Sequence, residues 1–331
     1  MIGLAKVAPG EGHVELAERP ERAPGPGEVA LEVHAVGVCG TDLHIWLGEY
    51  PSAPPVTMGH EVCGTVAKLG GDVDPAWAGA RVAVETFFST CGECAHCRAG
   101  KLSVCEHRRS IGTHVDGGFA PRLVLPARNL HRVPEGLPDA AAALSEPLAC
   151  VCNSLLDPSA VQPGDDVLVI GPGAIGLVAA QVARACGGRV TVRGAERDGA
   201  RLALAAELGF ATSVAGREDA SPADVVVECS GAEPGIADAL RAARRRGRIV
   251  QMGLRGAEVT IPYDLVCFHE LTISAGFASN PASWRRAMTL LQDGAVELAP
   301  LVTAVLPLGD WRRAFDASRA GDGVKYVLDP R

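Results

Sequence analysis

The sequence lacks any run of about 20 consecutive apolar residues, the length that a membrane-spanning helix needs, and we expect no span. It also lacks an excess of positive charge, because 31 Lys and Arg residues stand against 39 Asp and Glu, which leaves a net charge of −8. The broad basic surface of a nucleic-acid-binding protein is therefore not expected. The first residues contain no apolar core of a signal peptide, so we expect the protein in the cytoplasm.

What is present is enough apolar material for about two domains. The chain has 331 residues, of which 47% are hydrophobic and 21% are charged. This composition excludes a mainly disordered chain, which needs low hydrophobicity and high charge. Eleven cysteines, an odd number, argue against a disulfide framework in a cytoplasmic protein. Four of them lie within residues 91–105, and such clustering suggests a metal.

Two regions of different character follow one another along the chain. Residues 1–146 are rich in Gly and Pro and contain short strand-like runs of valine, which predicts a β-rich region with many turns. From about Gln162, apolar strands alternate with helical patterns. We expect strands over 167–170, 189–192, 225–229, 248–253 and 271–276, and helices over 174–187, 198–209, 233–247, 281–294 and 309–321. The predicted fold class is therefore α/β, with a parallel sheet in the second region.

A glycine-rich loop follows the first of these strands. Gly171, Gly173 and Gly176 have the G-x-G-x-x-G spacing, with Ala174 and Ile175 between the last two. The glycines allow a tight turn, a close approach of backbone to a pyrophosphate, and packing of the helix on the strand. The helix N-terminus offers free N–H groups to phosphates. The loop therefore predicts dinucleotide binding.

The end of the second predicted strand bears on which dinucleotide binds. An acid about 20 residues after the loop would hold the ribose 2′-OH of NAD, and Glu196 is in range. The strand end itself is Gly194, between Arg193 and Arg197. A small residue flanked by arginines would accommodate a 2′-phosphate. NAD and NADP both remain open, with a slight preference for NADP.

The four clustered cysteines, Cys91, Cys94, Cys97 and Cys105, have the spacing C-x2-C-x2-C-x7-C. Four thiolates can surround one Zn²⁺ tetrahedrally, and a site without an open position is structural. An iron–sulfur cluster is an alternative, since ferredoxin motifs begin in the same way. A nucleic-acid-binding zinc ribbon is a third interpretation, which the acidic composition disfavours.

A second set of metal-ligand residue types is dispersed through the first region: Cys39, Thr41, Asp42, His44, His60, Glu61 and Glu146. Together they offer one thiolate, one imidazole and one or two carboxylates. This is the ligand set of a catalytic zinc that keeps one position open for water or substrate. Asp42 could accept the imidazole N–H. Thr41 could hydrogen-bond a substrate hydroxyl, and His44 could pass a proton to solvent.

These motifs, CGTDLH, GHE, the cysteine cluster, EPLA and GPGAIG, resemble the zinc-dependent medium-chain alcohol dehydrogenase superfamily in order and spacing. Glutamate at position 146 is similar to the branch of sorbitol and threonine dehydrogenases. The resemblance covers essentially the whole chain. It implies a GroES-like catalytic domain over 1–146 with the structural zinc cluster, a doubly wound Rossmann domain over 147–275, and a return to the catalytic domain over 276–331.

The resemblance also implies roles for single residues. Cys39, His60 and Glu146 would hold a catalytic zinc, and Glu61 would be a fourth ligand that exchanges with water or stays behind the ligands. Thr41 and His44 would form a proton relay. Two Zn²⁺ per chain and NAD or NADP are the implied cofactors, and a homodimer or homotetramer is the implied assembly.

The implied activity is hydride transfer between the secondary alcohol of a polyol, sugar or aminocyclitol and NAD(P)⁺. Oxidation of an amino alcohol, as by L-threonine 3-dehydrogenase, is the alternative within this class. A zinc-free reductase is disfavoured, because such enzymes lack both ligand sets. A non-catalytic nucleotide-binding regulatory protein on the same fold is the alternative of another class, which the intact Thr41, His44 and Glu61 disfavour.

Overall fold

The computed structural model describes residues 1–217 and 221–331, which divide into two compact units. Unit 1 consists of Met1–Glu146, Asn280–Met288 and Leu301–Arg331, and unit 2 consists of Pro147–Ser279 and Thr289–Pro300. The expected domain limits were 1–146, 147–275 and 276–331. Within the last of these ranges, residues 276–279 and 289–300 lie in unit 2. No helix among the described residues is long and apolar enough to span a membrane.

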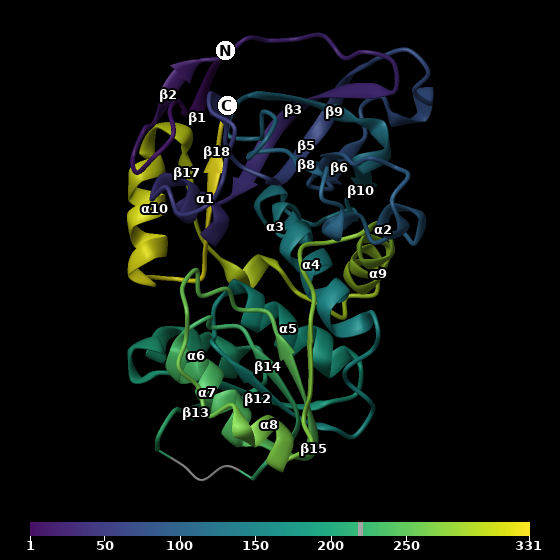
Figure 1. Cartoon of the computed structure of the whole chain (residues 1–331). Coiled ribbons are helices and arrows are strands. Elements are labelled where there is room, and N and C mark those ends of the chain that lie inside the picture. The colour runs from purple at the N-terminus through teal and green to yellow at the C-terminus, as the bar shows by residue number, and fades with distance from the viewer. Residues whose placement is uncertain (218–220) are drawn as a thin grey trace. The chain divides into compact units, whose positions relative to one another are not determined.

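Unit 1 is rich in strands, as the alternating valines predict (Figure 1). Its strands are β1 (Ile2–Lys6), β2 (Val14–Glu18), β3 (Glu28–Gly37), β4 (Val56–Thr57), β5 (Glu61–Leu69), β6 (Arg81–Val84), β7 (Phe87–Ser89), β8 (Arg109–Ser110), β9 (Arg122–Pro126), β10 (Leu130–Arg132), β17 (Val302–Pro307) and β18 (Lys325–Asp329). Its helices are α1 (Gly40–Trp46), α2 (Ala95–Arg98), α3 (Asp139–Ala143) and α10 (Trp311–Ala320). Two more helices, α4 (Ser145–Leu156) and α9 (Pro281–Gln292), contain residues of both units.

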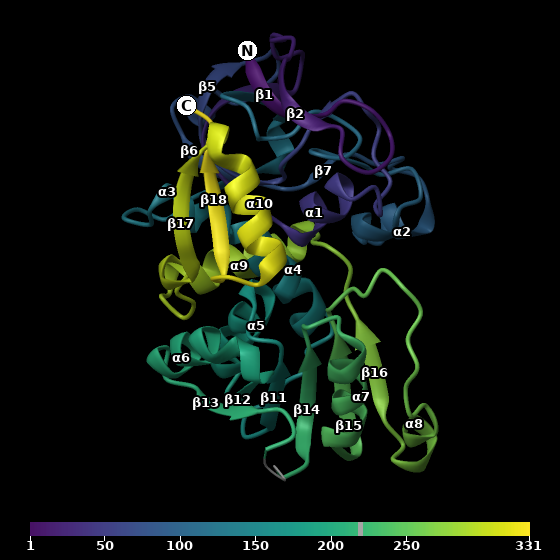
Figure 2. The same cartoon turned by 90° about the vertical axis from the view of Figure 1, so that its left-hand side faces the viewer.

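The largest sheet of unit 1 joins segments from both ends of the sequence. Its order over the described residues is β10-β6-β5-β3-β18-β17, with β9 also paired to β3. Figure 2 shows β17 and β18 side by side beneath α10. Trp311 and Phe315 of α10 are buried and pack edge-to-face with ring centroids 5.3 Å apart. The late strands and α10 therefore complete the core that the early strands begin.

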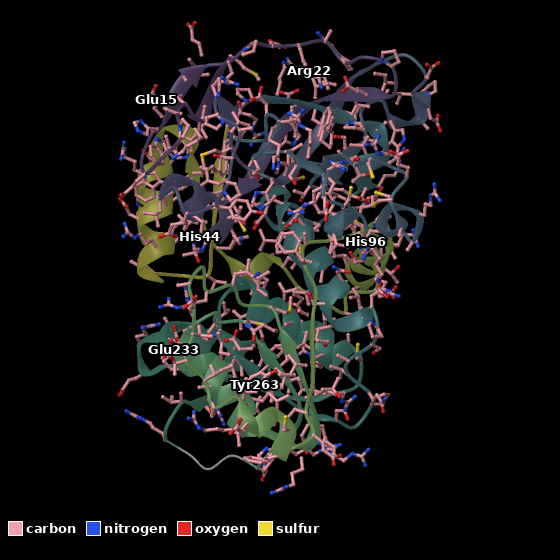
Figure 3. All side chains as sticks on the ribbon, viewed as in Figure 1. Glu15, Arg22, His44, His96, Glu233 and Tyr263 are labelled. Carbon is pink, nitrogen blue, oxygen red and sulfur yellow. The ribbon has the colours of Figure 1, made fainter. Side chains whose placement is uncertain are left out.

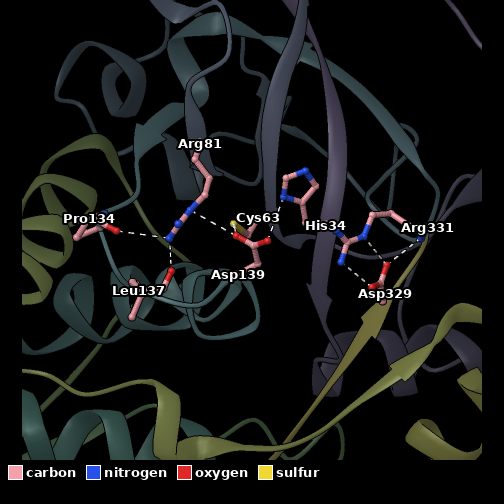
Figure 4. A network of polar contacts seen from close by, with 8 residues as sticks. All are labelled: His34, Cys63, Arg81, Pro134, Leu137, Asp139, Asp329 and Arg331. Atoms are coloured by element: carbon pink, nitrogen blue, oxygen red, sulfur yellow. Dashed lines mark hydrogen bonds and ion pairs between the residues drawn. The ribbon is translucent and has the colours of Figure 1, made fainter.

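A network of polar contacts anchors helix α3 to this sheet (Figure 4). The Asp139 carboxylate lies 3.1 Å from His34 Nδ1 of β3 and 3.4 Å from Arg81 Nε of β6. The buried Cys63 thiol of β5 donates to Asp139 at 3.7 Å, and burial raises its pKa. The charge at the start of α3 thus ties together three neighbouring strands, and we interpret the network as structural.

Unit 2 is a parallel sheet flanked by helices. Its strands are β11 (Asp166–Ile170), β12 (Arg189–Gly194), β13 (Ala211–Val214), β14 (Ala223–Glu228), β15 (Ala243–Gln251) and β16 (Thr272–Ala275), and its helices are α5 (Ala174–Ala185), α6 (Gly199–Glu207), α7 (Glu233–Ala242) and α8 (Asp264–Phe268). The spatial order of the described strands is β13-β12-β11-β14-β15-β16, and all neighbours are parallel. This is the 3-2-1-4-5-6 order of a doubly wound dinucleotide-binding sheet. The predicted α/β class and its parallel sheet are confirmed.

One predicted element is wrong at its end. We expected a helix over 233–247, but α7 ends at Ala242 and strand β15 begins at Ala243. The three arginines that follow are good helix formers, yet Ala243 is extended and pairs with Ala223 of β14. Pairing with the neighbouring strand therefore overrides local helix propensity here.

Candidate functional site

A compact group of metal-ligand side chains lies where β3 ends and β5 begins. Ligand atoms of Cys39, His60 and Glu61 all lie within 4.8 Å of one another. The antiparallel pairing of β3 with β5 places Gly37 opposite Glu61, and Cys39 follows Gly37 by two residues. The sheet register therefore brings together ligands that are about 20 residues apart in the sequence. A thiolate, an imidazole and a carboxylate suit Zn²⁺.

Asp42 lies next to this group, close to both Cys39 and His60. Its side chain is fully buried, and Oδ2 accepts a hydrogen bond from the Cys39 N–H at 2.9 Å, which also caps helix α1. Its Oδ1 has no hydrogen-bond partner among the described residues and lies 3.8 Å from His60 Nδ1. Burial raises the pKa of Asp42, while the nearby His60 lowers it. The carboxylate is therefore placed to orient the imidazole, as we expected.

In the Cys39–His60–Glu61 group, His60 carries a proton that a bound metal ion would displace. Burial alone would lower the pKa of His60, but the Cys39 sulfur and then Asp42 raise it well above its usual value. The protonated form of the His60 imidazole is thus favoured in the metal-free cluster. Metal ligation requires neutral imidazole and thiolate, so binding would release this proton.

Lys325 is a member of the cluster that the sequence did not reveal. Its Nζ donates to both oxygens of Glu61, at 2.7 and 2.9 Å, and to the Val38 carbonyl at 3.0 Å. Both side chains are buried. Burial would lower the pKa of Lys325, but Glu61 raises it, so the ammonium stays charged. Glu61 is therefore shared between this ammonium and any metal at the cluster.

Glu146, which we expected as a ligand, accepts a hydrogen bond through one carboxylate oxygen from a residue outside the ligand group. Its Oε1 accepts a hydrogen bond from Thr86 Oγ1 at 2.9 Å, and both side chains are buried. It is not part of the three-residue group of mutually close ligand atoms. Its role as a zinc ligand stays a prediction, and Thr86, which the sequence analysis missed, orients it.

Thr41 and His44 lie on helix α1 at the spacing that puts two residues on one helix face. Thr41 Oγ1 lies 3.8 Å from Cys39 Sγ. His44 Nδ1 lies 2.7 Å from Glu49 Oε2, and its side chain is 37% exposed (Figure 3). Among the described residues no hydrogen bond joins Thr41 to His44. One residue of the predicted relay therefore lies at the cluster and the other at solvent.

The four-cysteine group is as compact as one metal ion requires. Sulfur atoms of Cys91, Cys94, Cys97 and Cys105 lie within 4.8 Å of one another, and two of the distances to Cys91 Sγ are 3.9 Å (Cys97) and 3.7 Å (Cys105). A tetrahedron with Zn–S bonds of about 2.3 Å has edges of about 3.8 Å. The backbone N–H groups of Cys94 and Glu93 lower the pKa of Cys91 to about 6. A cluster of several irons would hold the sulfurs further apart, so the geometry favours one zinc.

The glycine loop has the backbone that its spacing predicts. Gly171 has φ +96°, and a Cβ on Gly176 would lie 1.9 Å from the Gly171 carbonyl oxygen. Gly173 caps helix α5 without a side-chain hydrogen bond, and a Cβ there would meet no atom within 4 Å. A pyrophosphate could therefore approach the backbone at Gly173 and the first N–H groups of α5.

The residues near the end of β12 that we considered together for the choice of dinucleotide have different surroundings in the structure. A Cβ on Gly194 would lie 3.0 Å from both Asp198 and Pro172, so a larger residue would require these neighbours to shift. Arg193 turns into unit 2 and binds Asp238 at 3.1 and 3.2 Å. Glu196 is exposed and pairs with Arg217. Arg197 is exposed and has no ion pair among the described residues.

Comparisons with known proteins agree with both units. Residues 25–135 match the family model of the alcohol dehydrogenase GroES-like domain, and residues 174–293 match that of the zinc-binding dehydrogenase. These matches confirm the predicted GroES-like and Rossmann parts of the fold.

Whole-length relatives point the same way. The chain is 37% identical to a sorbitol dehydrogenase of Halalkalibacterium halodurans, over 100% of this chain and 99% of the relative. It is 34% identical to an L-threonine 3-dehydrogenase of Deinococcus radiodurans, over 99% and 98%. A zinc-binding dehydrogenase of Sinorhizobium meliloti 1021, solved with NADP bound, superimposes with a TM-score of 0.90 at 32% identity and 99% coverage of both chains.

Proposed function

The chain belongs to the zinc-dependent medium-chain alcohol dehydrogenase superfamily, in the branch of sorbitol and threonine dehydrogenases, and we propose that it oxidises the secondary alcohol of a polyol, sugar or aminocyclitol with NADP⁺. It is an oxidoreductase that uses zinc and a nicotinamide dinucleotide. The observation that carries the proposal is the Cys39–His60–Glu61 group at the end of β3, in which His60 and Glu61 are buried and Cys39 is partly buried.

Cys39, His60 and Glu61 would hold the catalytic zinc, with Glu146 as the other candidate ligand. A bound zinc supplies Lewis acidity, which lowers the pKa of an alcohol and polarises a carbonyl. Asp42 would fix the orientation of His60 by accepting its ring N–H. Lys325 would fix Glu61, because its ammonium already binds both carboxylate oxygens.

The proton of the alcohol would leave through the side chains of helix α1. Thr41 lies beside Cys39 and can accept a hydrogen bond from a substrate hydroxyl. His44 can hold the proton and release it to water, since its ring is partly exposed and is paired with Glu49. Thr41→Val should lower kcat while Thr41→Ser retains it, as measured by absorbance at 340 nm.

The glycine loop and the N-terminus of α5 would hold the pyrophosphate of the dinucleotide, which supplies a hydride acceptor when bound. The preference for NADP rests on Gly194, which puts no acid at the strand end, and on the exposed Arg197. Arg197→Ala should raise the KM for NADP⁺ about fivefold to tenfold and leave that for NAD⁺ within twofold. An equal rise for both dinucleotides would remove the preference for NADP.

A second, structural zinc would bind the four cysteines and stabilise a segment that has little core of its own. Cys91, Cys94 and Cys97 are only partly buried, and the surrounding elements, α2 and β8, are short. We expect two zinc ions per chain by elemental analysis. Less than one per chain in native protein would contradict both sites.

A homodimer is supported by the free edge of the unit 2 sheet. Strand β16 lies at this edge, and all four of its residues are exposed (Figure 2). Leu254, Tyr263 and Phe268 of the same unit are 65–69% exposed. An unpaired, partly apolar edge is a template for strand pairing with a second copy. Analytical ultracentrifugation should give twice the chain mass, and Ile273→Pro should reduce it.

The deciding experiment is a substrate panel with zinc-loaded protein. NAD⁺ and NADP⁺ are each combined with polyols, sugars, aminocyclitols and L-threonine, and absorbance at 340 nm is followed. Turnover of a polyol or sugar supports the proposal. Turnover of L-threonine alone favours the second candidate, the activity for which several relatives are named. Dinucleotide binding without turnover of any alcohol favours the regulatory alternative.

A further inference from the structure

Unit 1 contains a cavity that has no part in the proposed function. Its volume is about 710 Å³. It lies between the loop that precedes β3, strand β9 and the loop after β8, and Arg22 at its rim is labelled in Figure 3. None of Cys39, His60, Glu61 and Glu146 lines it. The cavity is therefore separate from the candidate metal cluster.

The charge of the cavity wall is opposite to that of the whole chain. Four cationic side chains line it, Arg19, Arg22, Lys68 and Arg122, against the two carboxylates Glu21 and Asp116. When Glu28, which pairs with Arg22, is counted as a third carboxylate, the difference, four minus three, is a formal charge of +1, in a chain of net charge −8. An anion is the ligand that such a wall attracts.

The cations differ in how far they are already neutralised. Arg19 binds Asp116 at 2.9 Å, Arg122 binds Glu21 at 3.1 Å, and Arg22 pairs with Glu28. Lys68 has no ion pair or hydrogen bond from its side chain among the residues that the structure describes. Lys68 is thus the one cationic side chain of the described wall that is left for a negative charge.

Apart from His114, the rest of the wall is mainly apolar. Ala30, Val56, Val115 and Leu123 line it, together with Phe88. Arg22 lies 6.0 Å above the Phe88 ring, which closes this part of the wall with a cation–π contact. Volumes of about 300–1,000 Å³, apolar walls and a few polar groups are typical of small-molecule sites.

We propose that this cavity binds a small organic monocarboxylate, with its charge on Lys68 and its apolar body against Phe88 and Leu123. A monoanion fits better than a phosphate dianion, because the three arginines already have carboxylate partners. The apolar wall selects against small hydrophilic anions, whose burial would gain nothing from it. The site lies outside the proposed catalytic machinery, so its occupancy does not depend on turnover.

Benzoate is a suitable probe, and benzamide is its neutral counterpart of equal shape. Binding is measured by isothermal titration calorimetry on zinc-loaded, full-length protein saturated with NADP⁺, which fills the dinucleotide site. We expect one benzoate per chain, and at least tenfold weaker binding of benzamide. Equal affinity for both probes, or no saturable binding of benzoate up to about 10 mM, would overturn the proposal.

Variants locate the bound probe. Lys68→Ala should weaken benzoate binding at least tenfold, whereas Arg255→Ala, which removes an exposed cation of unit 2, should change it less than twofold. Ala23→Trp should abolish binding by filling the cavity from its exposed loop. Benzoate that binds the Lys68→Ala and Ala23→Trp variants normally but not Cys39→Ser would belong to the metal cluster, and the proposal would be wrong.

Discussion

The four-cysteine cluster and the Cys39–His60–Glu61 cluster are both ligand groups of unit 1, yet they are built in opposite ways. The four cysteines come from fifteen consecutive residues, and three of them are partly exposed. The other cluster takes its ligands from residues at or next to the ends of two paired strands, β3 and β5. It is largely buried and depends on Lys325, 264 residues from Glu61. The first is a local structure that a metal can organise, and the second is a product of the sheet.

This difference predicts that loss of a ligand residue has a different effect in each cluster. Loss of a cysteine ligand should damage the stability of a segment and spare the chemistry. Loss of a ligand in the second cluster should spare the fold, because the strands are held by their own core, and remove the chemistry. The same substitution in both clusters, cysteine to serine, tests this contrast directly.

The largest effect is expected from Cys39→Ser. We expect kcat/KM to fall at least about 1,000-fold, which is about 4 kcal/mol of transition-state stabilisation, because the ligand set loses its thiolate. Absorbance at 340 nm measures the rate, and circular dichroism should show an unchanged melting temperature within about 3 °C. Cys63→Ser, at a buried cysteine that is not in the ligand group, is the control and should retain its zinc. A near wild-type rate in Cys39→Ser would refute the catalytic assignment.

Removal of the Lys325 ammonium, which is far from Glu61 in the sequence, should also have a large effect. Lys325→Met leaves the Glu61 charge buried without its partner, which costs about 3–5 kcal/mol of stability in the metal-free protein. The midpoint of urea unfolding measures this loss. Lys68→Met, the same change at an exposed lysine, should cost less than about 0.5 kcal/mol. Adding Glu61→Gln to Lys325→Met should recover part of the loss, and no recovery would mean that the two residues are not coupled.

Cys94→Ser should have a smaller effect, on stability alone. We expect zinc content to fall by one ion per chain and stability to fall by about 2 kcal/mol, or about 4–8 °C in melting temperature. The turnover rate per folded molecule should stay within twofold of wild type. A loss of turnover as large as that of Cys39→Ser would show that the two clusters are not independent.

The smallest expected effect concerns the residue that orients Glu146. Thr86→Val removes the 2.9 Å hydrogen bond and should weaken zinc binding at the second cluster about tenfold. Competition with a chromophoric chelator measures the affinity, and Thr86→Ser should restore it by returning the hydroxyl. If the valine variant binds zinc normally, Glu146 takes no part in the metal site.

The sequence predicted those features whose signal is local. The cysteine spacing and the glycine loop are contiguous motifs, and the structure gives both the compact geometry that they indicate. Residue types alone suggested a second ligand set, and the resemblance implied Cys39, His60 and Glu146 as its ligands with Glu61 as a fourth. Only the register of β3 and β5 brings Cys39, His60 and Glu61 together. Lys325 and Thr86 carry no motif, and their partners are 264 and 60 residues away. A lysine among strand residues gives no sign that it is buried beside a carboxylate.

The pairing of Glu61 with Lys325 also sets an order of events during synthesis on the ribosome. At about 5–20 residues per second, Lys325 is made roughly 13–50 s after Glu61. Every residue of unit 2 is made in that interval, because its segments lie between the two. Unit 1, whose synthesis begins first, is thus the last to be completed. Until β18 is made, Glu61 lacks the positive charge of Lys325. Zinc that arrives early meets Glu61 with no competing ammonium.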